Sequence, residues 1–297
     1  MTSLFSRLCA FLDTPDEPVD NNKPLAPNKP VSSQATITPL LGHPKLNNAA
    51  YWKDGNDPEP RLVIFSGAGL SHESGLSLFR GQDGLWENHS VEEVCNANTW
   101  RLFRDKVEPF YEKRWADSRA AEPNAGHVWC AEQAKRGAVL LTQNVDDLLE
   151  RAGAPLVGHL HGRLDHRCCF ACDFRWQREP TSQLEDEQPC PACQSEDTRV
   201  DVVFFHEQAQ AYETARRVLG GLRAQDVLMI VGTSIEVYNP IHSLTTNCQV
   251  WVVDPNPPAK LLDYPRVKVF NSPASELGGK PAMIWEVYRQ ANSAADR

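Results

Sequence analysis

The most specific local pattern in the sequence is a pair of Cys-x-x-Cys motifs, Cys169 with Cys172 and Cys190 with Cys193, separated by seventeen residues. Cysteines at this spacing are typical of zinc ribbons, and four thiolates fill the tetrahedral shell of Zn²⁺. No position is left for water, so we expect a structural rather than a catalytic metal. Cys168 is adjacent and offers an alternative pairing with Cys172, but the two-residue spacing favours Cys169.

A glycine-rich turn offers a candidate phosphate site. The segment 67–71, Gly-Ala-Gly-Leu-Ser, follows an apolar run and precedes a helix-like stretch. Backbone N–H groups at such a turn can hold a pyrophosphate, although glycines there also serve close packing alone. Phe79, Arg80 and Trp86 lie in the loop beyond. If that loop closes over a dinucleotide, Phe79 would exclude water and Arg80 would meet phosphate.

Polar residues follow the apolar run 139–141 directly: Gln143, Asn144 and Asp146. Ligands of open α/β sheets bind at the carboxyl ends of the strands. There an Asn can pair with an amide, and an Asp can hold a ribose hydroxyl or a carboxamide. The alternative is that Asn144 or Asp146 caps a following helix.

Two later runs end in the same way. The segment 232–234, Gly-Thr-Ser, follows the run 227–231 and forms a turn suited to phosphate. Asp254 follows the run 250–253, where an acidic residue commonly accepts hydrogen bonds from an adenosine ribose.

His161 stands just before the cysteine motifs, in His-Leu-His-Gly. Its unperturbed pKa near 6.5 makes a histidine the natural general base at neutral pH. The alternative is a structural hydrogen-bonding role, and its neighbours decide between the two.

The elements that must position these residues alternate along the chain. Apolar runs predict strands at 61–65, 137–142, 200–205, 227–231, 250–253 and 267–270. Helical apolar spacing predicts helices at 91–97, 108–116, 126–136, 146–152 and 207–222. Such alternation predicts an α/β fold with a parallel, doubly wound sheet. The cysteine motifs interrupt it, so we expect a small module at about 163–200, inserted in the larger domain.

Composition narrows the class of protein. The chain has 297 residues, 41% of them hydrophobic, with a net charge of -9. An acidic balance argues against nucleic-acid binding. The longest apolar runs have the length of buried strands, which argues against a membrane span. The nine cysteines with paired short spacings favour a reducing compartment, and we expect the cytosol.

The first sixty residues differ in composition from the rest of the chain. Nine prolines stand there among polar residues, a composition that predicts a mostly disordered extension over 1–60. The apolar start, 1–12, lacks the features of a secretory signal, whereas a transit peptide stays an alternative. We expect residues 61–297 to form the folded domain.

Taken together, these motifs resemble the sirtuins, NAD-dependent protein lysine deacylases, over about 61–284. The matching residues occur in the family's order. They are Gly67-Ala68-Gly69-x-Ser71-x-x-Ser74-Gly75, Phe79-Arg80-Gly81, Gln143-Asn144-Val145-Asp146, His161-Gly162, the four cysteines, Val203-Phe204-Phe205-x-Glu207 and Gly232-Thr233-Ser234.

The resemblance implies a Rossmann-like domain, a small zinc domain and NAD consumed as a co-substrate between them. In the implied mechanism the acyl-lysine carbonyl oxygen attacks the anomeric carbon of the nicotinamide ribose, and nicotinamide leaves. Asn144 and Asp146 would position the ribose and carboxamide, and His161 would act as general base on a ribose hydroxyl. The products would be free lysine, nicotinamide and acyl-ADP-ribose.

The resemblance also implies which residues contact each ligand. The backbone near Val203 and Phe204 would pair with the substrate peptide as an added strand. The residues expected to contact NAD are Gly67, Ala68, Gly69, Ser71, Ser74, Phe79, Arg80, Trp86, Gln143, Asn144, Asp146, Gly232, Thr233, Ser234, Asp254, Asn256 and Ala274.

One feature bears on the acyl group. Tyr111 and Arg114 share a helix face and match the Tyr and Arg of desuccinylase-type sirtuins. A guanidinium suits a carboxylate because two parallel N–H donors meet its two oxygens. We therefore expect removal of succinyl, malonyl or glutaryl groups, with weaker deacetylation. The alternative is that Arg114 is a solvated helix residue.

The chain departs from the family pattern at five positions. Ser77 and Leu78 replace Pro and Asp or Thr, Leu149 replaces a common His, His206 replaces Gly, and Asp254 replaces Asn. His206 lies at the edge expected to bind the substrate peptide, so this departure bears on peptide affinity. Asp254 bears on the contact with the adenosine ribose, for which Asn256 could compensate.

Two other functions stay open. The same cleft would serve an NAD glycohydrolase or ADP-ribosyltransferase. A non-catalytic zinc-containing interaction module is the second alternative.

Overall fold

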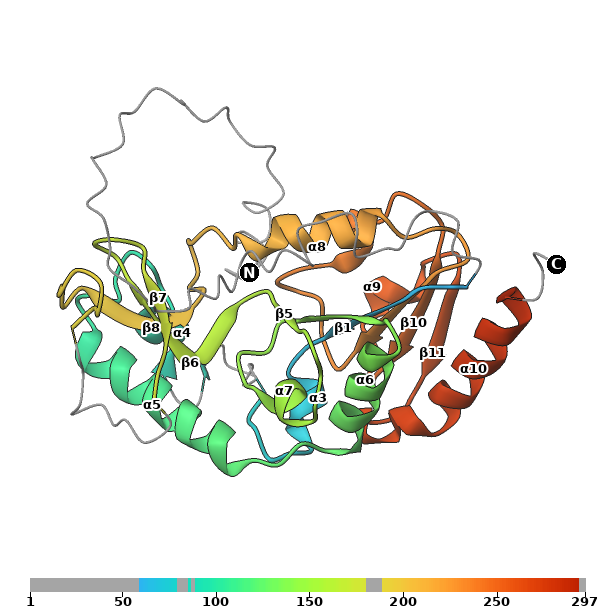
Figure 1. The fold of residues 1–297 in the computed structure, drawn as a ribbon, viewed down its shortest axis with the longest axis horizontal. Coiled ribbons are helices and arrows are strands. Elements are labelled where there is room, and N and C mark those ends of the chain that lie inside the picture. The colour runs from blue at the N-terminus through green and yellow to red at the C-terminus, as the bar shows by residue number, and fades with distance from the viewer. Residues whose placement is uncertain (1–58, 79–84, 87–88, 180–188, 294–297) are drawn as a thin grey trace, which may run out of the picture.

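The computed structural model describes residues 59–78, 85–86, 89–179 and 189–293 (Figure 1). The extension predicted over 1–60 lies almost wholly outside the described residues, as do Phe79 and Arg80. Among the helices described, none has both the length and the hydropathy to cross a membrane.

A six-stranded sheet forms the centre of the larger part. Its order is β11-β10-β9-β1-β4-β5, and each neighbouring pair is parallel. The strands are β1 (Leu62–Ser66), β4 (Val139–Thr142), β5 (Gly158–His159), β9 (Val227–Val231), β10 (Gln249–Val253) and β11 (Val267–Phe270). The strand order reverses between β1 and β9, and ligands of such sheets bind at that switch point.

Both faces of this sheet are covered by helices. Leu62 and Ile64 pack on one face, with Trp129 of α6 (Ala125–Lys135) and Trp285 of α10 (Lys280–Ser293). Val63 and Phe65 pack on the other, with α8 (Ala211–Gly220). Figure 1 shows α8 on the opposite side of the sheet from α6 and α10. The predicted doubly wound parallel sheet is confirmed.

A second, three-stranded antiparallel sheet has the order β7-β6-β8. It consists of β6 (Gly162–Cys169), β7 (Arg175–Gln177) and β8 (Thr198–Val202), and packs with α4 (Val91–Val94) and α5 (Arg104–Ala120) around a third core. The strand predicted at 200–205 was expected in the parallel sheet, but the structure has β8 in the smaller, antiparallel sheet, and the predicted end at 205 was wrong. Strand β8 stops at Val202 and pairs antiparallel with β6, because the chain leaving the cysteine motifs turns back along β6.

The remaining elements are short. They are α3 (Gly69–His72), α7 (Leu148–Arg151), α9 (Ala259–Leu262), the two-stranded pair β2 (Leu85–Trp86) and β3 (His89–Ser90), and the 3₁₀ turns η3 (Pro240–Ser243) and η4 (Ala274–Gly278). The helix predicted at 146–152 is a single turn, α7. The helix predicted at 207–222 begins only at Ala211.

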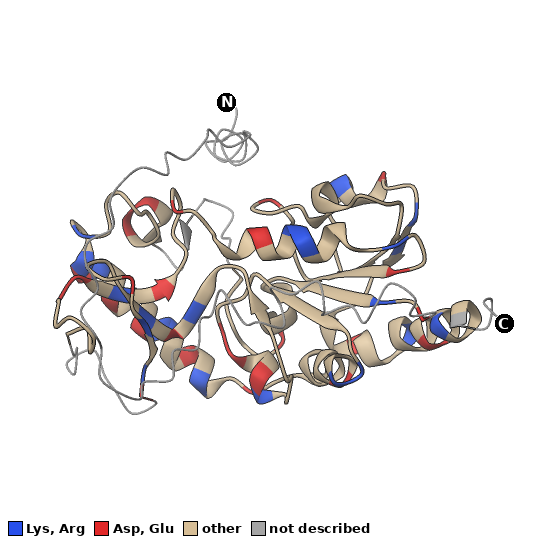
Figure 2. Cartoon of the chain, turned by 45° about the horizontal axis from the view of Figure 1, so that its top comes forward, with Lys and Arg blue, Asp and Glu red and all other residues tan. Residues whose placement is uncertain are grey.

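Charged residues avoid the central sheet. Figure 2 shows acidic and basic residues interspersed over the helices and the smaller sheet, whereas the central strands are almost free of them. The segments β1, β4 and β9 read LVIFS, VLLT and VLMIV and are buried along their whole length. Such continuous apolar runs are typical of strands buried on both faces.

Candidate active site and metal centre

The glycine turn after β1 lies against the turn after β9. The Gly69 N–H donates to the Gly232 carbonyl oxygen at 2.8 Å. A Cβ on Gly69 would lie 2.6 Å from Gly232 Cα, and one on Gly67 would lie 2.6 Å from Thr233 Cβ. Gly232 also has a φ of +57°, in the left-handed region. Glycine is therefore required for this close packing, and the two turns border one cavity.

Ser71 connects the polar residues at the carboxyl end of β4. Its hydroxyl donates to Asp146 Oδ2 at 3.0 Å and accepts from Asn144 Nδ2 at 2.9 Å. Burial is the main effect on Asp146 and raises the pKa of its carboxyl group, while its bonds to Leu148 and Ser71 act in the opposite direction. This network fixes the orientation of both Asn144 and Asp146, which face the cavity.

The side chain of His127 contacts the Ser71 hydroxyl. It is 0% exposed, and burial lowers its pKa to about 4. Its Nδ1 accepts from the Asn124 N–H at 3.2 Å, so Nε2 carries the proton and faces Ser71 Oγ at 3.2 Å. Asn124 caps α6 reciprocally with His127 and also donates to Ser74 Oγ. Asn124 and His127 have the sequence spacing of a capping box, but nothing in the sequence connects them with Ser71.

His161 has the hydrogen bonds of a neutral base. Its Nδ1 lies 3.1 Å from the Gln143 carbonyl oxygen, an acceptor, which places the proton on Nδ1. Its Nε2 then holds a lone pair, and Tyr212 Oη lies 2.7 Å away as the donor. Burial lowers the pKa of His161 to about 4, so the ring is neutral at pH 7.

A cluster of charged and polar side chains contacts the segment that follows β4, at the Asn144 carbonyl oxygen. The buried His159 contacts the Asn144 carbonyl oxygen through Nδ1 and Glu150 Oε1 through Nε2, both at 2.8 Å. Burial by itself would lower the pKa of His159, but the charge of Glu150 and the hydrogen bonds to Glu150 and Asn144 together outweigh it, and the pKa is raised. Arg163 binds both Glu150 and Asp165. The cluster thus ties the segment after β4 to β6.

The turns and networks surround a cavity of about 860 Å³, within the usual range for small-molecule sites. It brings together most of the residues predicted from sequence: Gly67, Ala68, Gly69, Ser71, Arg114, Gln143, Asn144, Asp146, His161, Val203, Phe204, Gly232, Thr233, Ser234, Asp254, Asn256 and Ala274. Ser74 and Tyr111 do not line it. The predicted contacts of Phe79 and Arg80, and of the Trp86 side chain, lie outside the described residues.

Tyr111 and Arg114 occupy different positions in this region. Arg114 lines the cavity and is the one arginine or lysine among its described lining residues. Tyr111 is 1% exposed and stacks on Phe204, with 5.3 Å between ring centroids. Burial raises the pKa of Tyr111 well above 10, so its hydroxyl stays protonated. Cys95, to which sequence reasoning gave no function, also lines the cavity.

The backbone N–H groups of Val203 and Phe204, where the substrate peptide is expected to pair, already donate hydrogen bonds within the protein. The Val203 N–H donates to the His161 carbonyl oxygen at 2.9 Å, and the Phe204 N–H to Glu207 Oε2 at 2.9 Å. His206, where the family has Gly, has a φ of +70° and lines the cavity. The Phe204 carbonyl oxygen accepts from the Glu207 N–H at 3.1 Å, so an added peptide strand would donate to the remaining lone pairs of the carbonyl oxygens here.

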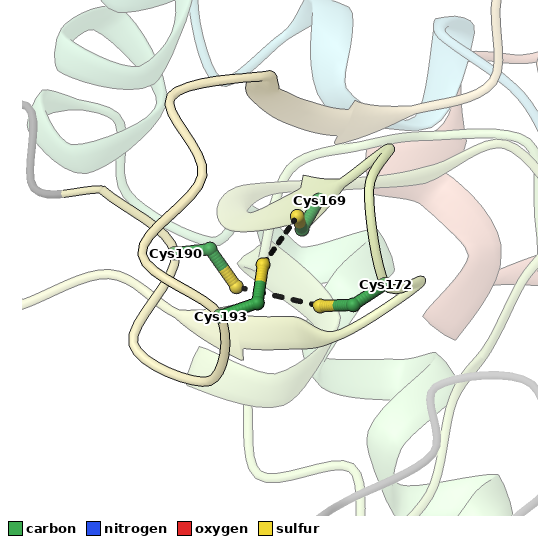
Figure 3. Close-up of side chains that lie close together, drawn as sticks. All are labelled: Cys169, Cys172, Cys190 and Cys193. Atoms are coloured by element: carbon green, nitrogen blue, oxygen red, sulfur yellow. Dashed lines mark hydrogen bonds between the residues drawn. The ribbon is translucent and has the colours of Figure 1, made fainter. Parts of the chain in front are cut away.

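The four predicted zinc ligands converge at one end of the smaller sheet (Figure 3). Sγ of Cys169 lies 3.6 Å from that of Cys193, and Sγ of Cys172 lies 3.6 Å from that of Cys190. All four sulfurs lie within 4.8 Å of one another. A tetrahedron with Zn–S bonds of ~2.3 Å has edges of about 3.8 Å, so the donor set fits Zn²⁺. Cys168 instead faces the Val200 carbonyl oxygen, at 3.8 Å.

Comparison with known proteins identifies the class. The model of the Sir2 family matches residues 67–239, and the chain belongs to this family. A protein of Campylobacter jejuni subsp. jejuni named NAD-dependent protein deacylase is 41% identical over 193 residues, covering 63% of this chain and 79% of the relative. One of Aggregatibacter actinomycetemcomitans with the same name is 36% identical over 205 residues, covering 67% and 95%.

Solved structures agree with this assignment. A Sir2 homologue in complex with NAD superposes with a TM-score of 0.66 at 30% identity, covering 79% of this chain and 91% of that chain. A variant of a Sir2 homologue in complex with ADP-ribose gives 0.67 at 30% identity, covering 80% and 94%. The resemblance to sirtuins predicted from the motifs is confirmed.

Proposed function

We propose that this protein is an NAD-dependent lysine deacylase that removes succinyl, malonyl or glutaryl groups from protein lysines, and acetyl groups more weakly. The proposal is supported by the residues that line one cavity. The cavity combines residues at the family's NAD and base positions with Arg114, the one arginine or lysine among its described lining residues. One NAD and one water are consumed per acyl group, giving nicotinamide, free lysine and 2'-O-acyl-ADP-ribose.

The part of the cavity beside β1, β4 and β9 suits NAD. The turns at Gly69 and Gly232 expose backbone there, and Asn144 and Asp146 are held by Ser71 toward the same space. NAD supplies an anomeric carbon with a leaving group. Asn144 and Asp146 would orient the nicotinamide ribose and carboxamide, and the neutral Nε2 of His161 would accept the proton of a ribose hydroxyl.

The part beside α5 suits an acidic acyl group. Cys95, Leu164 and Val202 line it and belong to one apolar core with Tyr111. In such surroundings a guanidinium binds a carboxylate more strongly than in water, and two parallel hydrogen bonds fix its orientation. An acetyl group has no carboxylate to offer Arg114. A contact between the Tyr111 hydroxyl and the acyl group stays a prediction.

Three further assignments belong to this proposal. Residues 61–297 form one catalytic unit, with the zinc module at about 163–200 inserted in the Rossmann-like domain. The partners are acylated lysine peptides, held along the carbonyl oxygens near Val203 and Phe204. The reduced thiols favour the cytosol, since none of the eight described cysteines forms a disulfide.

A panel of acyl-lysine peptides tests the acyl preference. We expect kcat/KM to be higher for succinyl, malonyl and glutaryl peptides than for acetyl peptide. Arg114→Met should lower the succinyl value about tenfold to a hundredfold, because loss of a charge-assisted pair costs about 1.5–3 kcal/mol, and change the acetyl value little. Lys113→Met is the matched control, since Lys113 is exposed on the same helix and does not line the cavity. Succinyl activity that survives Arg114→Met would overturn the assignment.

The same assay separates the alternative functions. Nicotinamide release from NAD that does not depend on acyl peptide would indicate a glycohydrolase. ADP-ribose attached to the peptide would indicate a transferase. Absence of any NAD consumption, with zinc bound, would indicate an interaction module.

A further inference from the structure

Tyr212 contacts the group proposed as the base. Its Oη lies 2.7 Å from His161 Nε2, and its ring meets the imidazole edge-on, with 5.8 Å between centroids. Tyr212 comes from the first turn of α8, an element of the larger domain, and lines the same cavity as His161. No sequence motif connects the two residues, which are 51 positions apart.

The direction of this hydrogen bond follows from the other side of the ring. The Gln143 carbonyl oxygen can only accept, so the proton of neutral His161 is on Nδ1. The Tyr212 hydroxyl therefore donates to the Nε2 lone pair. That lone pair is the proton acceptor that the proposed deacylation needs. A ribose hydroxyl can reach it directly only if Tyr212 leaves.

Aromatic packing opposes such a displacement. The Tyr212 ring packs on Tyr238 with 4.7 Å between centroids, and Tyr238 stacks on Phe65 of β1 at 5.8 Å. The Tyr238 hydroxyl is fixed in turn by Ser243 Oγ at 2.8 Å. The row anchors Tyr212 to the central sheet. Its phenolic oxygen can still accept a hydrogen bond while its O–H donates to His161, because a phenol is both donor and acceptor.

We propose that Tyr212 is a catalytic residue that relays the proton from a ribose hydroxyl of NAD to His161. The ribose O–H bond breaks as a new O–H bond forms at Tyr212 Oη, and the original Tyr212 O–H bond breaks as the N–H bond forms at His161 Nε2. The phenol ends neutral, the imidazole ends as imidazolium, and the ribose oxygen becomes the nucleophile. This inference rests on the proposed deacylation.

The test compares Tyr212→Phe with wild type in two reactions of the full-length, zinc-loaded enzyme. Nicotinamide–NAD exchange in the presence of acyl peptide reports the step before the base acts, and it should be unchanged. Complete deacylation should fall by ~10²-fold, the usual contribution of a positioned proton-transfer group. Tyr264→Phe is the matched control, because it removes a tyrosine hydroxyl on the same side of the central sheet, bonded to the Thr246 carbonyl oxygen, and does not line the cavity; both rates should stay at the wild-type level.

Three results would overturn the relay. Deacylation by Tyr212→Phe at the wild-type rate would show direct transfer to His161. Faster deacylation would show that Tyr212 obstructs the base. An equal loss of exchange and deacylation would assign Tyr212 a structural role.

A measurement without substrate keeps this inference separate from the proposed function. Titration of the His161 ring by NMR reports its pKa in the free protein. Removal of a donor to Nε2 destabilises the neutral form, so Tyr212→Phe should raise the pKa of His161 from about 4 toward 6.5. An unchanged pKa would refute the hydrogen bond itself. A wild-type protein inactive on every acyl peptide would refute the proposed function instead.

Discussion

At the scale of single residues, the site depends on which group carries each proton. Ser71 Oγ accepts from Asn144 and donates to Asp146, and the buried His127 faces it with Nε2. The Gln143 carbonyl oxygen sets the tautomer of His161 in the same way. The motif residues could be predicted from the sequence, because their types and strand-end positions suit NAD. Tyr212 and His127 could not, because only the fold brings them to His161 and Ser71.

The pH dependence of turnover should reflect the lowered pKa of His161. A base with a pKa of about 4 is neutral throughout the neutral range, so kcat/KM should stay nearly constant from pH 8 to pH 6 and fall only as the pH approaches 4. An ordinary histidine would lose half its activity near pH 6.5. Initial rates with acyl peptide across this range check the prediction, and a midpoint near 6.5 would contradict it.

Ser71→Ala should disturb three partners at once. It leaves Asp146, Asn144 and His127 without the shared hydroxyl, and buried polar groups that lose a partner cost about 1–3 kcal/mol each. We expect weaker NAD binding and a lower free energy of unfolding, measured by calorimetric titration and urea denaturation. Ser66→Ala is the control, because Ser66 makes one buried bond, to Thr142, and does not line the cavity. A loss no larger than that of the control would contradict the central role of Ser71.

At the scale of elements, continuous apolar runs predicted the strands best. The bounds expected for β9 and β11 agree with the structure. The two-residue β5 is too short to leave a pattern. Helix α10 was not predicted, because Trp285 is buried while Met283 and Val287 are exposed, which obscures its apolar period.

The contact between the two glycine turns gives a prediction about backbone packing. Gly69→Ala places a Cβ 2.6 Å from Gly232 Cα, where neither backbone can yield. We expect a loss of about 1–3 kcal/mol in stability and a marked loss of NAD affinity, since both turns border the cavity. Gly278→Ala is the matched control, because its nearest neighbour would be Trp129 Cδ1 at 3.8 Å. Denaturation and NAD titration of both variants check this, and equal behaviour would contradict it.

The metal centre predicts a difference between adjacent cysteines. Cys169→Ser should lower bound zinc well below one per chain and destabilise the smaller sheet, since Cys169 is one of four converging thiols. Cys168→Ser should retain one zinc, because Cys168 faces a carbonyl oxygen. Elemental analysis of the purified proteins measures both, and zinc loss in the Cys168 variant would contradict the ligand set.

At the scale of the whole molecule, two histidines connect stability to pH, the buried His127 and the half-buried His161. His127 and His161 have pKa values of about 4 in the folded protein, below the unfolded value of 6.5. Between these values the unfolded chain binds more protons than the folded one, so the free energy of unfolding falls as the pH drops from 6.5 toward 4. The full effect is on the order of 3 kcal/mol per histidine.

Denaturation at pH 7 and pH 5 measures this dependence. His127→Asn should reduce the pH slope by roughly half of the part that the two histidines contribute, because one of the two groups is removed. An undiminished slope in His127→Asn would contradict the lowered pKa.

The position of Gly162 has a mechanical consequence. This residue has a φ of +81°, directly follows His161 and begins β6, whose far end carries Cys169. His161, the proposed base, thus lies where the chain passes from the larger sheet to the smaller one, whereas the glycine turns proposed to bind NAD belong to the larger sheet alone. If the cysteine site lost its metal, β6 would lose the support at its far end and His161 would be displaced, whereas the glycine turns of the larger sheet would keep their positions. Gradual zinc removal should therefore abolish turnover while NAD still binds.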